Sequence, residues 1–178
     1  MRFSLRTFLV LFAVLGILLA IAESTTRNWR QRIQIQSELV EMGAIYVSFD
    51  ESNSPDWISF SVTNISEEFA ALKHVKDIWL DNAQLTDSGI EHLAGIDSIG
   101  CLHMTECNVT DRQIEILSKI NSIKILRLND STVSDKSIDY IVAMRNLTSV
   151  DISGTMISED GSSYLKRQRP DLTVRHEN

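Results

Sequence analysis

Four side chains that could bind a partner or take part in catalysis stand 24 residues apart along the chain: Trp79, His103, Arg127 and Asp151. Together they offer an aromatic surface, a group that transfers protons near neutral pH, and charges of both signs. Aromatic and arginine side chains also dominate the energetic centres of protein interfaces. The regular spacing of such different chemical types indicates that one repeated structural element presents all four.

The repeated element is a 24-residue unit that recurs three times over residues 75–146, and a fourth copy begins at Leu147. Apolar residues occupy the first, fourth, sixth and eleventh positions of each copy. In the first copy these are Val75, Ile78, Leu80 and Leu85. The spacing of two predicts a short strand whose third, fifth and seventh residues face away from the core. Apolar residues three apart, such as Ile90 and Leu93, then predict a helical turn.

A hydroxyl residue followed by an acid joins the strand to the helical turn in every copy. The pairs are Thr86-Asp87, Thr110-Asp111, Ser134-Asp135 and Ser158-Glu159. Both side chains suit a helix start, because they accept hydrogen bonds from unpaired amides and the carboxylate complements the helix dipole. We interpret them as helix caps. The alternative, a ladder of carboxylates that binds a cation, lacks the dense oxygen-ligand spacing of such sites, and we expect neither a metal nor a cofactor.

The repeat resembles the leucine-rich repeat family through its Leu-x-x-Leu-x-Leu frame and the Leu-Thr-Asp-x-Gly-Ile element at residues 85–90. The similarity covers residues 75–170 and is greatest to the cysteine-containing subtype, which places Cys or a small residue at the ninth position. That position holds Ala83, Cys107, Ser131 and Thr155. The resemblance implies an α/β fold, a right-handed solenoid of about four repeats, and a scaffold for binding with no defined activity.

The remaining segments form the ends of this predicted solenoid, since a stack of repeats exposes its core unless something covers it. We expect a helix, a strand and a loop over residues 27–55 and an irregular N-terminal cap over residues 56–74. The repeat domain then extends over residues 75–178 and closes with a strand at Leu172–Val174.

Residues 1–26 contain an apolar segment, with sixteen uncharged residues between Arg6 and Glu23. That length lies between the core of a signal peptide, up to ~15 residues, and a membrane span of ~20 residues. Trp29 follows as an interfacial anchor would. We predict a transmembrane or signal-anchor helix in a single-pass membrane protein whose repeats lie outside the cytoplasm. Cleavage after Ala22 would instead give a secreted protein.

Charge and cysteine content limit the kinds of partner and cross-link. The net charge is −7, and residues 33–178 carry 12 basic and 23 acidic groups. An acidic domain without a basic stripe is a poor match for phosphate, so we expect no nucleic-acid partner. Cys101 and Cys107 are separated by extended chain that exceeds the ~7 Å limit between bridged alpha carbons. We therefore predict no disulfide, and a buried thiol at Cys107.

The four side chains named first occupy the fifth position of successive copies, so they should form one row across parallel strands ~4.8 Å apart. We call Trp79, His103, Arg127 and Asp151 the strand-face row. Ile125, in the neighbouring third position, adds apolar contact. We predict that this face binds a protein or peptide. The alternative is that Arg127 and Asp151 pair with each other while Trp79 covers the end of the repeats.

These observations favour a non-enzymatic, membrane-anchored binding protein whose partner the sequence does not identify. An alternative is a soluble substrate-recognition adaptor of the ubiquitin-ligase type, which cysteine-containing repeats often serve, although an F-box-like segment is missing. A hydrolase based on His103 and Asp151 belongs to a different class. These residues would stand two strands apart, ~10 Å, which is too far for a base and the group that orients it.

Overall fold

The computed structural model describes residues 5–41, 44–49, 55–60, 65, 72 and 74–177. The description excludes the side chains of residues 5–21, 45–46, 55–57 and 59–60. It also excludes most residues of the predicted cap (residues 56–74) and of the loop before it. Contacts divide the chain into two compact units, Met1–Glu38 and Leu39–Asn178.

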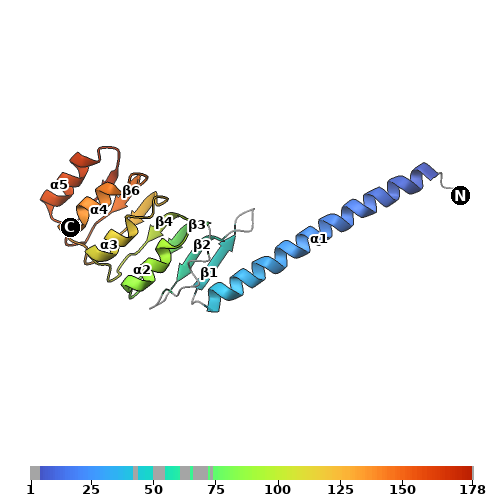
Figure 1. Cartoon of the computed structure of the whole chain (residues 1–178), viewed down its shortest axis with the longest axis horizontal. Helices are drawn as coiled ribbons and strands as arrows, with labels where there is room; N and C mark the ends of the chain where they lie inside the picture. Colours follow the sequence, from blue (N-terminus) through green and yellow to red (C-terminus); the bar gives the residue numbers. More distant parts are fainter. Residues whose placement is uncertain are drawn as a thin grey trace. The chain divides into compact units, whose positions relative to one another are not determined.

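Helix α1, Leu5–Glu41, makes up most of the first unit (Figure 1), and its last three residues belong to the second. In the part of the chain that the structure describes, no helix combines the length and the apolar character needed to cross a membrane. This finding corrects the prediction of a transmembrane or signal-anchor helix, and with it the prediction of a single-pass membrane protein with repeats outside the cytoplasm. The apolar run that suggested the anchor falls almost wholly on residues 5–21, whose side chains are not described.

The second unit is built on one sheet whose strands follow the chain in the order β1-β2-β3-β4-β5-β6-β7 (Figure 1). The strands are Ala44–Phe49 (β1), Pro55–Phe60 (β2), His74–Trp79 (β3), Ser98–His103 (β4), Ile125–Arg127 (β5), Ser149–Asp151 (β6) and Thr173–Arg175 (β7). Strands β1 and β2 are antiparallel, whereas each later strand is parallel to its predecessor. From β3 onward the register pairs each residue with the one 24 positions later.

A helical segment follows each of the strands β3 to β6. These segments are α2 (Asp87–Ala94), α3 (Asp111–Leu117), the short 3-10 turn η2 (Asp135–Ser137) continued by α4 (Ile138–Ala143), and α5 (Glu159–Gln168). In Figure 1 the α-helices lie side by side in chain order. The predicted hydroxyl caps are confirmed, because each hydroxyl accepts a hydrogen bond from a backbone amide of the segment that it precedes.

The core of the second unit lies between the sheet and these helices. Inward strand residues such as Leu102 and Leu126, and helix residues such as Ile90 and Ile114, are fully buried. Each contributes roughly 1.5–3 kcal/mol through the apolar surface that it removes from water. This packing fixes the strand register, because a slip by one residue would turn the buried side chains outward.

The turns after strands β3 to β6 share one left-handed backbone conformation. Its residues are Asn82, Glu106, Asp130 and Gly154, with φ between 56° and 67°. The amide of each donates to a carbonyl of the next copy, for example from Asn82 to Thr105 at 2.9 Å. Consecutive copies are therefore joined by main-chain hydrogen bonds beyond the ends of their strands.

The fold class is α/β, as the sequence indicates, but the prediction of a right-handed leucine-rich repeat solenoid with a transmembrane helix is corrected. The second unit has a mixed sheet that begins with an antiparallel pair, β1 and β2. Its helical segments differ in length and type, from the 3-10 turn η2 to the ten-residue α5. The described residues thus form an α/β fold with a largely parallel sheet.

Candidate functional site

The strand-face row lies across four consecutive parallel strands. Its members end β3, β4, β5 and β6, and the register pairs Trp79 with His103, His103 with Arg127, and Arg127 with Asp151. Asp151 is in turn paired with Arg175 on β7, which the sequence analysis missed. The signal was present, because Arg175 lies one further period of 24 residues along the chain.

The first two members of the row form an aromatic stack. The rings of Trp79 and His103 are 4.1 Å apart at their centroids and 9° from parallel, and His103 is only 6% exposed. Burial lowers the pKa of His103 and the positive charge of Arg127 lowers it further, although Asp77 and Asp81 oppose the shift. His103 is therefore neutral at pH 7 and serves as part of an aromatic surface.

Asp151, at the other end of the row, is held by hydrogen bonds from its surroundings. Its Oδ1 accepts from the Ser153 amide at 3.1 Å and from the Ser153 hydroxyl at 2.7 Å. Its Oδ2 lies 3.8 Å from Nε of Arg175. Burial raises the pKa of Asp151, but hydrogen bonds from Asn129 and Ser153 outweigh burial and leave the pKa below its ordinary value. The predicted alternative, an ion pair between Arg127 and Asp151, is not formed.

Arg127 is the exposed cation of the row. Its guanidinium makes neither an ion pair nor a hydrogen bond with any residue that the structure describes. Ile125, two positions earlier on β5, is half-buried and in register with Cys101 and Ser149. The centre of the row therefore combines an uncommitted cation with a small apolar surface.

Both cysteines are free, and Cys107 is buried as predicted. Burial raises the pKa of each thiol to about 11, and a hydrogen bond with Asp77 contributes to the shift at Cys101. The thiolate is the reactive form of cysteine. Neither side chain is therefore activated as a nucleophile at neutral pH.

The arrangement that a hydrolase would need is not assembled around His103. Strand β5 separates it from Asp151, and the carboxylate near its Nε2 is that of Asp77, at 4.0 Å. Among the described residues, no group of three or more His, Cys, Asp or Glu side chains is placed to hold a metal ion.

Two of the acids after the helix caps link one copy of the repeat to the next. Asp111 accepts hydrogen bonds from the amide and the hydroxyl of Ser134, at 2.7 and 2.6 Å. Asp135 does the same for Ser158, at 2.8 and 2.7 Å. Each of these carboxylates thus holds the cap residue of the following copy, a second role that the capping interpretation missed.

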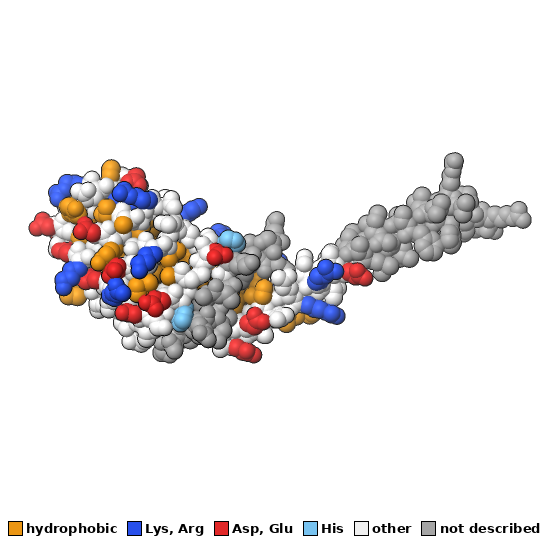
Figure 2. All heavy atoms as spheres, viewed as in Figure 1, with side chains coloured by type: hydrophobic (Ala, Val, Ile, Leu, Met, Phe, Trp, Pro, Cys, Tyr) orange, Lys and Arg blue, Asp and Glu red, His pale blue; other side chains and the backbone are white. Residues whose placement is uncertain are grey.

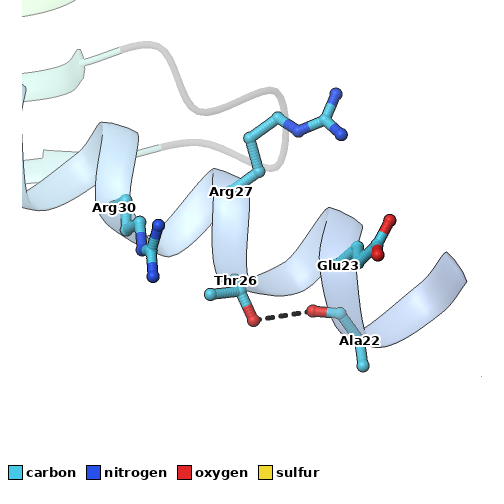
Figure 3. A pocket seen from close by; sticks show the side chains of 5 residues that line it. All are labelled: Ala22, Glu23, Thr26, Arg27 and Arg30. Atoms are coloured by element: carbon cyan, nitrogen blue, oxygen red, sulfur yellow. Dashed lines mark hydrogen bonds between the residues drawn. The ribbon is translucent and has the colours of Figure 1, made fainter. Parts of the chain in front are cut away.

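Two surface hollows are lined by other parts of the chain. One lies on α1 between Ala22 and Arg30, where the Thr26 hydroxyl donates to the Ala22 carbonyl at 2.7 Å (Figure 3). The other lies between residues 94–97, at the end of α2, and residues 119–122, after α3. Neither is lined by a member of the strand-face row.

The surface charge of the second unit is mixed where Figure 2 displays it, with acidic and basic side chains interspersed. This pattern differs from the continuous basic stripe of proteins that bind nucleic acid.

Compared with known proteins, the chain matches no family model and no curated protein. The resemblance to leucine-rich repeats stays a prediction, and functional inference rests on the geometry of the row.

Proposed function

We propose that this protein is a non-enzymatic binding protein and that its strand face takes a protein or peptide. The observation that carries the proposal is the state of Arg127, an exposed guanidinium with no partner in the described structure. It lies in register between His103, which is stacked on Trp79, and Asp151. Arginine beside aromatic surface is typical of the residues that dominate binding energy.

The chemistry of the row favours binding over catalysis. A nucleophile needs a base within hydrogen-bond reach and a third group that orients the base. His103 is buried and neutral, and the Cys101 thiol, with a pKa of about 11, stays protonated at neutral pH. These states suit recognition, in which the side chains offer shape and charge without transferring protons.

The dimensions of the row favour an extended segment as the ligand. Four strands at ~4.8 Å spacing place Trp79 and Asp151 roughly 14 Å apart. Extended chain rises about 3.3 Å per residue, so roughly four residues of a peptide would cross the row. Side chains of such a segment could contact the aromatic stack and Arg127 simultaneously.

Selection from a phage-displayed library of random peptides, with the full chain as bait, tests the proposal. We expect enriched peptides whose binding to the Trp79→Ala and Arg127→Ala variants is at least tenfold weaker. Tyr164→Ala, on the exposed side of α5, is the matched control and should bind as the unmodified chain does. Amide NMR spectra establish that the variants are folded. The proposal is wrong if no peptide is enriched. It is also wrong if a folded variant that carries both Trp79→Ala and Arg127→Ala binds the enriched peptides as well as the unmodified chain does.

A further inference from the structure

The charges on the strand face are unequally satisfied. Arg175 is engaged by Glu177, with contacts of 3.1 and 3.2 Å, and approaches Asp151 at 3.8 Å. Asp151 also accepts hydrogen bonds from Ser153. Arg127 lies in the same row but has no such partner among the described residues. The face therefore presents one cation whose hydrogen-bond donors are all available.

The neighbours of Arg127 do not compete for these donors. On β4, His103 is held neutral by burial and by Arg127 itself. On β6, Asp151 is 9% exposed and its oxygens are directed to Ser153 and Arg175. A guanidinium in this position can form two parallel hydrogen bonds to an incoming carboxylate, the geometry that makes such pairs strong and specific.

We infer that the strand face takes an acidic peptide segment, in which an Asp or Glu carboxylate pairs with Arg127 and a neighbouring apolar side chain contacts Ile125. This inference rests on the proposed function and specifies the chemistry of its partner. Charge complementarity selects the occupant: the cation is uncommitted, whereas Asp151, the acid of the row, accepts hydrogen bonds from Ser153 and lies 3.8 Å from Arg175. The register places Ile125 on the same strand, two residues away.

The composition of selected peptides tests this inference. Peptides selected from the random library on the full chain should be enriched in Asp or Glu at one position. A synthetic peptide of the enriched sequence should bind Arg127→Gln ten- to a hundredfold more weakly. Lys136→Gln removes the same charge from an exposed position in η2 and is the matched control, with binding changed less than twofold.

Charge reversal provides the second measurement. Arg127→Glu should lose the acidic peptide and should recover binding when Lys replaces the enriched acid, because the pair is restored with its signs exchanged. The inference is overturned if the selected peptides show no acidic position, or if Arg127→Gln binds them unchanged. In either case, peptides that still require Trp79 would leave the proposed function standing. Failure to enrich any peptide would instead refute the proposed function itself.

Discussion

Two arginines in the second unit have opposite environments. Arg169, directly after α5, is 3% exposed and donates to the carbonyls of Met144 and Leu147 at 2.9 and 2.8 Å. It also pairs with Asp171 at 2.8 Å, and this hydrogen bond raises the pKa of Arg169. Arg127, on the strand face, is exposed and has no partner among the described residues.

The difference separates an arginine that the fold requires from one that it does not. A buried charge persists only where hydrogen bonds compensate for its lost hydration. The contacts of Arg169 meet that condition, and they bind the chain after α4 to the end of α5. An exposed arginine without partners adds little to stability, so the side chain of Arg127 is available for binding.

Arg169→Leu should lower the free energy of unfolding by about 3 kcal/mol, because it leaves buried carbonyls without donors. Urea unfolding of the full chain, followed by circular dichroism, measures the loss. Arg167→Leu is the matched control, since Arg167 is exposed in the last turn of α5, two residues before Arg169, and it should change stability by less than about 0.5 kcal/mol. Equal effects of the two substitutions would remove the distinction between a structural and an available arginine.

Ser158→Ala should cost about 1–2 kcal/mol, because Ser158 caps α5 and also donates to Asp135 of the preceding copy. Ser163→Ala, at an exposed position within α5, is the control, and its loss in free energy of unfolding should be only a small fraction of the loss in Ser158→Ala. Urea unfolding again measures both. If the two variants were equally stable, the hydrogen bonds between copies would not contribute to the fold.

Arg127→Gln should change the free energy of unfolding by less than about 0.5 kcal/mol, the usual range for surface substitutions. The same variant should lose the acidic peptide, so stability and binding should respond independently. A loss of more than 1 kcal/mol in urea unfolding would show that Arg127 supports the fold and would weaken the comparison with Arg169.

The pKa of His103 should rise in Arg127→Gln and fall further in Asp77→Asn, because the Arg127 charge lowers this pKa and the Asp77 charge raises it. NMR titration of the ring protons measures both shifts. Since the folded pKa lies below the ordinary value of 6.5, the unfolded chain binds more protons, and stability falls as the pH drops through 6.5. Arg127→Gln should reduce that loss. If the pKa of His103 were unchanged in Arg127→Gln, the charge of Arg127 would have no electrostatic effect on His103.

Much of the candidate site could be predicted from periodicity alone. Residues at one position of a 24-residue repeat must lie on neighbouring strands if the copies fold alike, and the register aligns Trp79, His103, Arg127 and Asp151. The helix caps could also be predicted, because a hydroxyl before a helical turn finds its hydrogen-bond partner within the same copy. Periodicity could not predict the ion-pair partner of Asp151, because both neighbouring strands place an arginine beside it, Arg127 on β5 and Arg175 on β7.

The larger errors arose where local pattern was extended to architecture. The solenoid prediction rested on the 24-residue repeat of residues 75–170, whereas the sheet also includes the antiparallel pair β1 and β2 before that repeat. The membrane prediction rested on the apolar run near the N-terminus, and no helix among the described residues could cross a bilayer.

By itself, the amino-acid sequence determined the alternation of short strands and helical turns, the caps and the members of the strand-face row. These depend on spacing and on contacts within one copy. Only the tertiary structure decided that Arg169 is buried and Arg127 is available, because the carbonyls that hold Arg169 come from residues more than twenty positions earlier. The role of a charged side chain depends on the partners that folding brings to it.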